Sequence, residues 1–332
     1  MPGFDVRRYF LLLNTIRFDS FTINFGFNMK KTDYYTSNDG TKIAFYCWLP
    51  EDDPIAIVQI SHGMAEHAER YEDFAEFLNK NRIAVYANDH RGHGKTAGSV
   101  DQLGYFSDKN GWIKVVTDMR ILTRVIRQDY PRLPIILLGH SMGSFLARTY
   151  ITLYDDINGV ILSGTADQPK AVILAGRLMA YFQLLKQKAT TPSPFFDNLS
   201  FGAFNKPYEQ EGPMSWLSTD KRVVKKYVDD PYCGFICTLG MFKDLFYGLN
   251  YISRKEHNQW IRFTLPIYLV SGSEDPVGEN GKGPENVAKI YRKHQLEEVS
   301  VNIFKGMRHE ILNETNKRKV YDDLLEWIQY HI

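Results

Sequence analysis

The sequence predicts an α/β fold, with a mostly parallel central sheet flanked by helices and a helical cap inserted late in the chain. From Thr32 onward, short β-rich runs alternate with amphipathic helical stretches, which is typical of a parallel sheet covered on both faces. Most of these runs are apolar throughout, as expected for strands buried on both faces. A long interval between Ser163 and Thr264 has helix-like patterns but no strand-like run, and it indicates the cap.

The predicted sheet begins with a hairpin. Residues 34–37 and 42–48 flank Asn38, Asp39 and Gly40, which favour a tight turn between antiparallel strands. Parallel strands are predicted at residues 55–60, 83–88, 134–138, 159–162, 267–270 and 299–304. Helices that cover them are predicted, from one apolar face each, at residues 71–79, 112–128, 145–154, 285–294 and 317–330.

The inserted interval is predicted to fold as several short helices joined by turns. Prolines at positions 192, 194, 207, 213 and 231 separate its helix-like stretches, and proline interrupts helices. We therefore divide the chain into an α/β core of residues 29–163 and 264–332 and a helical cap insertion of residues 164–263.

One stretch of the cap carries a broad apolar helical face. Its members are Val172, Ile173, Leu174, Leu178, Met179, Phe182 and Leu185. Packing onto the sheet is the interpretation that we prefer. The alternatives are the wall of an acyl tunnel and a face that makes transient contact with a membrane surface.

Residues 1–28 form an N-terminal extension before a domain that opens at Met29. Their apolar run, residues 10–16, is too short to span a bilayer, and no small-residue cleavage site follows it. We expect an upstream start or an added, poorly ordered segment, and the alternative is a helix that packs on the core. Nowhere else does an apolar run approach the roughly 18 residues of a membrane span.

The charge balance and the cysteines exclude several classes of function. Lys and Arg total 40 against 39 for Asp and Glu, so no net field would hold a nucleic acid. Cys47, Cys233 and Cys237 have no spacing that builds a disulfide framework, which favours a reducing cytoplasm. Cys233 and Cys237 could share a helical face, but two soft ligands without an adjacent His or Cys make a poor metal site. We therefore predict no metal and no organic cofactor.

The strongest chemical signal is Gly139-His140-Ser141-Met142-Gly143, which directly follows one predicted strand and precedes a helical stretch. A G-x-S-x-G turn in this setting needs its glycines because strand and helix crowd the turn, and it lifts the serine hydroxyl above the sheet. This order of strand, turn and helix is the nucleophile elbow of the α/β-hydrolase fold. Ser141 is therefore the predicted nucleophile.

A serine hydroxyl needs a base to take its proton and an acid to orient that base. His309 is the best placed of nine histidines because it follows the last predicted strand, whereas His140 is expected to point away from the elbow. In this fold the acid lies between serine and histidine along the chain. Asp275, after the strand at residues 267–270, is preferred because α/β sheets place ligands at the carboxyl ends of their strands. Its rivals are Glu274 and Asp167.

Acyl transfer also needs hydrogen-bond donors aimed at the developing oxyanion. One predicted donor is the backbone N–H of Met142, the residue after the nucleophile. The other is the backbone N–H of Met64, in the loop after the strand at residues 55–60, where Gly63 allows close backbone approach. The alternative for this loop is a turn glycine followed by a core-facing methionine.

These motifs resemble those of the monoacylglycerol lipase and lysophospholipase branch of the α/β-hydrolase superfamily, also described as serine aminopeptidase-like. The resemblance spans Met29 to the C-terminus, and the cap is its weakly patterned part. By resemblance, Glu66, His67 and Arg91 would fix loops rather than catalyse. The segments that carry the resemblance are residues 61–71, 89–94, 139–143, 272–277 and 307–310.

The resemblance implies a serine hydrolase that cleaves carboxylic esters of lipid-like substrates, favouring a monoacylglycerol or a lysophospholipid. Small carboxylic esters are the fallback, and the same catalytic residues could also serve a peptidase or a thioesterase, since a triad does not fix the leaving group. A binding protein that kept the fold without catalysis is the alternative from another class. The expected partner is a small-molecule or lipid ester, and the sequence predicts no oligomeric state.

Overall fold

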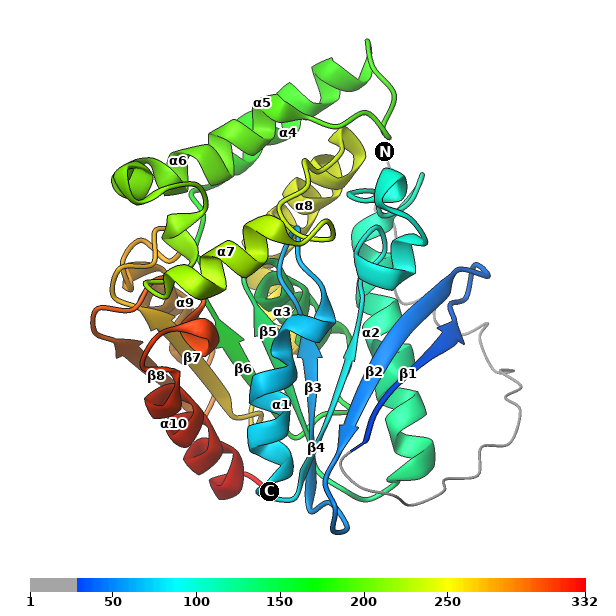
Figure 1. Cartoon of the computed structure of the whole chain (residues 1–332), viewed down its shortest axis with the longest axis vertical. Coiled ribbons are helices and arrows are strands. Elements are labelled where there is room, and N and C mark those ends of the chain that lie inside the picture. The colour runs from blue at the N-terminus through cyan, green and yellow to red at the C-terminus, as the bar shows by residue number, and fades with distance from the viewer. Residues whose placement is uncertain (1–28) are drawn as a thin grey trace.

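A computed structural model describes residues 29–332, so the predicted N-terminal extension lies outside the described residues. The centre is an eight-stranded sheet in the order β1-β2-β4-β3-β5-β6-β7-β8 (Figure 1). Its strands are β1 Met29–Thr36, β2 Lys42–Leu49, β3 Ala56–Ser61, β4 Ile83–Asn88, β5 Ile135–His140, β6 Gly159–Ser163, β7 Ile267–Gly272 and β8 Val299–Phe304. All the predicted strands are present, although β1 begins five residues earlier than expected.

The sheet is parallel except around β2, which pairs antiparallel with both β1 and β4. The pairs from β4 through β8 are all parallel. Gly40 closes the β1–β2 hairpin at φ +86, a conformation that glycine adopts without strain. Strands β3 to β7 are buried at every position, which explains why their sequences are mostly apolar instead of alternating between apolar and polar residues. The predicted mostly parallel sheet is confirmed.

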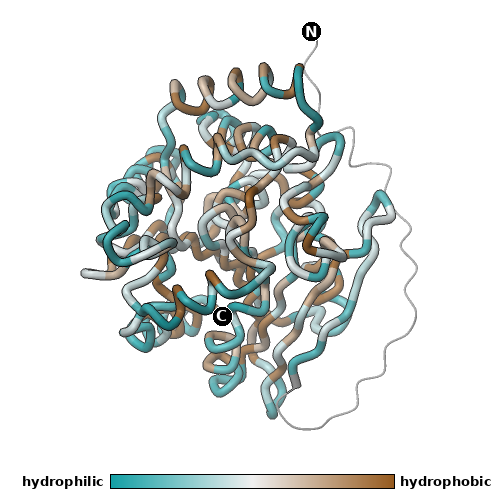
Figure 2. Tube along the Cα trace, turned by 45° about the horizontal axis from the view of Figure 1, so that its top comes forward, coloured by the Kyte–Doolittle hydropathy of each residue, from teal (hydrophilic) through white to brown (hydrophobic). Residues whose placement is uncertain are grey.

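Helices cover both faces of this sheet, as predicted. The core helices are α1 Glu72–Asn79, α2 Gly111–Asp129, α3 Met142–Leu153, α9 Lys282–Lys293 and α10 Lys317–Tyr330. Buried side chains of α1 and α10, such as Phe74 and Leu324, pack in one hydrophobic cluster with the strands. Those of α2, α3 and α9, such as Val115, Leu146 and Val287, pack in a second cluster on the other face. Apolar residues therefore gather in the middle of the molecule and polar residues on its outer turns (Figure 2).

Between β6 and β7 the chain forms helices without adding a strand to the sheet. These helices are α4 Lys170–Leu184, α5 Pro194–Asp197, α6 Ala203–Asn205, α7 Lys221–Asp229 and α8 Leu239–Ile252. They lie together above the core in Figure 1. At 15 and 14 residues, α4 and α8 are longer than the short helices that the prolines predict, because all five prolines fall outside these two helices.

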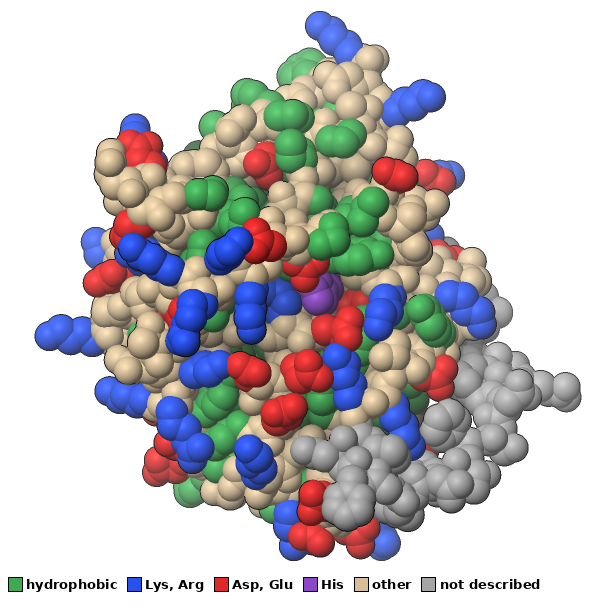
Figure 3. All heavy atoms as spheres, in the orientation of Figure 1, with side chains coloured by type: hydrophobic (Ala, Val, Ile, Leu, Met, Phe, Trp, Pro, Cys, Tyr) green, Lys and Arg blue, Asp and Glu red, His purple; other side chains and the backbone are tan. Residues whose placement is uncertain are grey.

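Helix α4 packs against α8, and not onto the sheet as we preferred from the sequence. A Cβ on Gly176 of α4 would come within 2.4 Å of the Phe246 ring of α8, so the glycine permits this close approach. The opposite side of α4 is uncovered, and Figure 3 shows apolar side chains in green gathering on this upper part of the molecule. The exposed apolar residues along it are Val172, Leu174, Leu178, Tyr181, Phe182 and Leu185. The prediction was wrong because helical periodicity locates an apolar face without showing what covers it.

Candidate active site

Ser141 lies in a tight turn between the end of β5 and the first residue of α3. Its backbone has φ +53 and ψ −120, a strained conformation for a residue with a side chain. A Cβ on Gly143 would come within 1.9 Å of the Ser61 carbonyl oxygen, and one on Gly139 within 2.4 Å of the Gly143 carbonyl oxygen. Both glycines of the motif are therefore required by backbone contacts, which is the physical reason for the spacing seen in the sequence.

Asp275 and His309 form a buried hydrogen-bonded pair. His309 Nδ1 lies 2.8 Å from Asp275 Oδ1, although the two residues are 34 positions apart. Asp275 also accepts hydrogen bonds from the Ser271 hydroxyl at 2.9 Å and from the Val277 N–H at 2.9 Å. Burial alone would raise the pKa of Asp275, but the His309 charge and these hydrogen bonds hold that pKa below its ordinary value. The carboxylate is thus ionised and its orientation is fixed.

The imidazole of His309 is held on several sides. A Cβ on Gly164 would come within 2.8 Å of His309 Cε1, so this glycine makes room for the ring. The Trp216 ring lies against it, with ring centroids 5.0 Å apart. Burial alone would lower the pKa of His309, but the Asp275 charge and hydrogen bond raise it above the ordinary histidine value.

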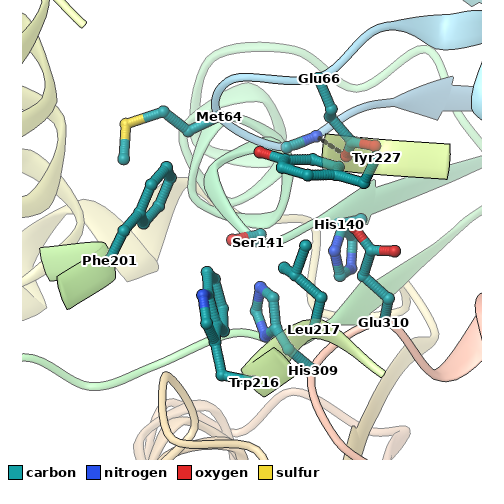
Figure 4. A pocket seen from close by; sticks show the side chains of 11 residues that line it. Met64, Glu66, His140, Ser141, Phe201, Trp216, Leu217, Tyr227, His309 and Glu310 are labelled. Carbon is teal, nitrogen blue, oxygen red and sulfur yellow. Dashed lines mark hydrogen bonds between the residues drawn. The ribbon is translucent and has the colours of Figure 1, made fainter. Parts of the chain in front are cut away.

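Ser141 and His309 line the same pocket (Figure 4). His309 Nε2 is buried and lacks a hydrogen-bond partner among the described residues, so no hydrogen bond joins it to the Ser141 hydroxyl. Such bonds are often long in the free enzyme and tighten only when substrate binds. The predicted nucleophile, base and acid are therefore brought together by three different loops.

The two rival acids lie differently. Glu274 is exposed, and its backbone carbonyl accepts a hydrogen bond from the Tyr208 hydroxyl. Asp167 is half-buried and does not line the pocket. Of the three carboxylates, only that of Asp275 is hydrogen-bonded to His309.

The predicted oxyanion donors flank Ser141 from two elements. Met64 lies in the loop after β3, residues 62–67, which we call the β3 loop, and it lines the pocket. Met142 has a buried side chain and is the first residue of α3, a helix of 12 residues. The first N–H groups of a helix have no partner within the helix and favour negative charge. Met142 thus directly follows Ser141, and Met64 lines the same pocket as Ser141.

A buried ionic network holds the β3 loop. Glu66 Oε1 accepts hydrogen bonds from the Gly63 N–H at 2.6 Å and from the Tyr71 hydroxyl at 2.9 Å. Arg70 donates to Glu66 at 2.6 Å and makes a bidentate pair with Glu310, at 2.7 and 2.6 Å. Because Glu310 follows His309, the guanidinium joins the β3 loop to the histidine loop. The role of Glu66 expected from the resemblance, fixing this loop, agrees with these contacts.

His67 and Arg91, the other two groups expected to fix loops, also have partners. His67 Nε2 lies 2.9 Å from Oδ2 of Asp230, which follows α7. Arg91 is buried and donates to Asp118 and Asp39, each at 2.7 Å. Neither side chain lines the pocket. His67, Asp230 and Cys233 are also the described side chains that lie close enough together to hold a metal ion.

His140 does not point away from the elbow, contrary to our expectation. It lines the pocket, and its ring centroid lies 4.7 Å from that of His309. Burial, followed by the nearby His309 charge, lowers the pKa of His140 to about 4. The His140 ring is therefore uncharged at neutral pH and forms part of the pocket wall beside His309. The expectation failed because the last residue of a strand can turn its side chain toward the neighbouring loop.

The segment between β6 and β7 supplies much of the pocket wall, and the sequence did not identify these residues. Four residues of this segment face Ser141 or His309 in Figure 4: Phe201, Trp216, Leu217 and Tyr227. The turn that carries Trp216 is fixed to the histidine loop, since the Glu310 N–H donates to the Leu217 carbonyl at 2.7 Å. No local pattern marks such residues, because their contacts join segments that are far apart in the sequence.

The pocket has an apolar side and an acidic side. Met64, Phe201 and Trp216 lie on one side of Ser141, whereas Glu66 and Glu310 lie on the other (Figure 4). A serine beside a buried imidazole and carboxylate can perform nucleophilic acyl transfer without a further group.

Comparison with known proteins agrees with this arrangement. Residues 52–316 match the family described as serine aminopeptidase, S33. The chain is 30% identical over 297 residues to a monoacylglycerol lipase of Mycolicibacterium smegmatis, covering 88% of this chain and 95% of that protein. It is 28% identical over 304 residues to the human monoglyceride lipase, covering 87% of this chain and 88% of that protein. A crystal structure of a thermostable carboxyl esterase from Bacillus coagulans in complex with glycerol is similar, with a TM-score of 0.84, 26% identity, and coverage of 91% of this chain and 98% of that one.

Proposed function

Since this chain belongs to the serine aminopeptidase S33 family of α/β-hydrolases, we propose that it is a serine hydrolase that cleaves carboxylic esters of lipid-like substrates. One observation carries the proposal: a strained serine shares a pocket with a buried histidine, and that histidine is already hydrogen-bonded to a buried carboxylate. The relatives named as monoacylglycerol lipases support the substrate class.

In the proposed reaction, the Ser141 hydroxyl oxygen attacks the ester carbonyl carbon while His309 Nε2 accepts the hydroxyl proton. Asp275 keeps the other proton on His309 Nδ1 and stabilises the imidazolium that forms. The backbone N–H groups of Met64 and Met142 stabilise the oxyanion. Collapse of the tetrahedral intermediate transfers the proton to the leaving alcohol, and water then hydrolyses the acyl-enzyme by the same steps to release the acid.

The two sides of the pocket support an ester with an apolar acyl group and a polar, neutral alcohol. Met64, Phe201 and Trp216 offer apolar surface for an acyl chain. The opposite wall presents the carboxylates of Glu66 and Glu310, and the Arg70 guanidinium between them is already bonded to both. This wall retains one net negative charge, which disfavours an anionic phosphate and suits hydroxyl donors. A monoacylglycerol is therefore preferred to a lysophospholipid.

We expect the catalytic efficiency to rise with acyl length across a series of glycerol monoesters. If the apolar side binds the chain, each methylene that it buries contributes about 0.8 kcal/mol, and kcat/KM should increase about fourfold per methylene until the wall is filled. The measurement is release of fatty acid from glycerol monoesters of two to sixteen carbons, with anionic lysophospholipids of the same chains as the comparison. Efficiency independent of chain length, or faster cleavage of peptides or thioesters, would contradict the proposal.

The uncovered face of α4 supports transient contact with a membrane surface. Leu178 and Phe182 are 50% and 59% exposed on this helix, with Leu174 and Tyr181 beside them. An amphipathic helix binds a bilayer through apolar area that it removes from water. In keeping with contact rather than insertion, no helix within residues 29–332 is long and apolar enough to cross a membrane.

We expect the Leu178→Ser/Phe182→Ser variant to lose binding to phosphatidylcholine vesicles in a co-sedimentation assay. The control is Tyr330→Ser, which removes an aromatic side chain that is 79% exposed on a different helix. Hydrolysis of short, water-soluble esters should be unchanged in both variants. Equal sedimentation of both variants with wild type would exclude the α4 face as the docking surface.

We further propose the division into core and cap, and the cytoplasmic location of the protein, that are expected from the sequence. Residues 164–263 act as the cap and residues 29–163 with 264–332 as the core, which the run of helices between β6 and β7 supports. Cys47, Cys233 and Cys237 are free and buried, which supports a reducing compartment such as the cytoplasm.

A further inference from the structure

Three potential metal ligands from two distant segments meet beside the β3 loop. His67 belongs to that loop, whereas Asp230 and Cys233 lie in the cap segment between α7 and α8. One ligand atom from each side chain lies within 4.8 Å of the other two. On a tetrahedral zinc ion such atoms are roughly 3.3–3.7 Å apart. Small side-chain rotations would therefore bring all three onto one ion.

The ligands are held in place by their surroundings. Asp230 Oδ1 accepts a hydrogen bond from the Tyr232 N–H at 2.8 Å, which leaves Oδ2 directed at His67 Nε2, 2.9 Å away. The Cys233 N–H donates to the Asp230 carbonyl at 3.0 Å and closes the turn that carries both ligands. Hydrogen bonds of this kind orient the side chains that bind the metal in metal sites. Only small changes in side-chain conformation are thus needed for the three residues to bind one ion.

The local charge favours a cation. The carboxylates of Asp230, Glu66 and Glu310 and the guanidinium of Arg70 are close enough to act electrostatically on Cys233. Three negative charges thus face one positive charge, and Arg70 is already bonded to Glu66 and Glu310. The hydrogen-bond partners of the Asp230 carboxylate are the Tyr232 N–H and the His67 ring. A bound divalent ion would offset this excess.

From this geometry we propose that His67, Asp230 and Cys233 form a site for a divalent cation of the zinc type. Imidazole, carboxylate and thiolate together suit Zn²⁺, whereas calcium and magnesium prefer oxygen ligands alone. Cys233 is buried, but the side chains of His67 and Asp230 are 12% and 30% exposed, so an ion can enter from their side. A water molecule completes the tetrahedron, and the thiol proton is released when the thiolate binds.

The site would join the cap to the β3 loop. These segments already touch through the carbonyl of Ala65, which accepts hydrogen bonds from the Gly234 N–H at 2.9 Å and from the Tyr227 hydroxyl at 2.8 Å. An ion held by His67 on one side and by Asp230 and Cys233 on the other adds a bond that must break before the segments separate. Because Met64 lies in the β3 loop, metal would restrain the cap next to a proposed oxyanion donor. Binding itself is independent of the proposed esterase activity.

The sequence does not indicate this site because His67 is far from Asp230 and Cys233 along the chain. We predicted no metal site because Cys233 and Cys237 have no neighbouring histidine in the sequence. In the fold, His67 lies beside Cys233, although the two residues are 166 positions apart in the sequence. Cys237 lies outside the cluster and serves as the matched control.

The test is titration of the untagged, chelator-treated full chain with Co²⁺, a spectroscopic substitute for Zn²⁺. Wild type is expected to bind one equivalent and to show thiolate-to-cobalt charge-transfer absorption that Zn²⁺ displaces. Cys233→Ser should abolish this absorption, and His67→Ala and Asp230→Asn should each weaken binding at least about tenfold. Cys237→Ser should behave as wild type. Circular dichroism and Tm confirm that each variant is folded.

The second measurement follows hydrogen exchange in the cap. Zn²⁺ should slow exchange in peptides that contain residues 227–234 in wild type and leave Cys233→Ser unaffected. No charge-transfer absorption in wild type, its persistence in folded Cys233→Ser, or unchanged exchange on adding Zn²⁺ would overturn the proposal. These readouts do not use ester hydrolysis, so their failure is distinguishable from failure of the proposed function.

Discussion

Replacing Ser141 by alanine is expected to lower kcat for ester hydrolysis by on the order of a millionfold, because loss of a serine nucleophile removes the acyl-enzyme route altogether. The fold should survive, since alanine has the same Cβ and tolerates the φ of +53 no worse than serine does. The hydroxyl of Ser141 is also not needed by the elbow, whose hydrogen bonds run through its backbone: its N–H donates to the Ser163 carbonyl at 2.8 Å.

Labelling with a fluorophosphonate probe measures this directly. Wild type should be labelled at Ser141, and Ser141→Ala should not be labelled. The control is Ser200→Ala, in the segment between β6 and β7. The Ser200 hydroxyl donates to backbone carbonyls of its own helical segment, so this variant should be labelled like wild type. If wild type resists the probe while folded, the alternative of a non-catalytic binding protein gains support. Equal labelling of wild type and Ser141→Ala would place the nucleophile elsewhere.

The fold was predictable because its strands are parallel and buried on both faces. The first four residues of β5, Ile135–Leu138, are buried and apolar at every position, so this run stands out from the amphipathic helices on either side. The elbow was predictable for a steric reason, since Gly143 packs against the Ser61 carbonyl and cannot carry a Cβ. Asp275 and Glu274 are adjacent in one loop, and what distinguishes them, the burial of Asp275 and its hydrogen bond to His309, depends on the fold.

The parts of the site that sequence reasoning missed depend on contacts between distant segments. Arg70 and Glu310 are 240 positions apart, and nothing in either local sequence indicates the bidentate pair between them. Glu66 and Arg70 are only four positions apart, but Glu66 precedes the short helix Ala68–Tyr71 that carries Arg70, so helical spacing does not indicate their ion pair. For α4, the periodicity showed an apolar face correctly but could not show that α8 would cover its other side.

Replacing Asp275 by asparagine is expected to lower kcat by about ten-thousandfold, as loss of the acid does in other triads. An asparagine amide in place of the carboxylate would donate to His309 Nδ1, which forces the proton onto Nε2. The base would then face Ser141 with its proton instead of its lone pair. Glu274→Gln removes the neighbouring, exposed carboxylate and should retain wild-type activity.

The pH profile distinguishes this effect from simple loss of structure. In wild type, hydrolysis should fall as the pH drops through the pKa of His309, because only the neutral imidazole accepts the serine proton. Burial alone would lower this pKa, and the charge and hydrogen bond of Asp275 raise it above the ordinary histidine value. Without that charge the pKa falls, so the residual activity of Asp275→Asn should persist to lower pH than that of wild type. If the variant had only lost stability, fewer molecules would be folded, but the pKa of His309 in those molecules would be unchanged. The activity would then be lower at every pH, with the same dependence on pH as in wild type.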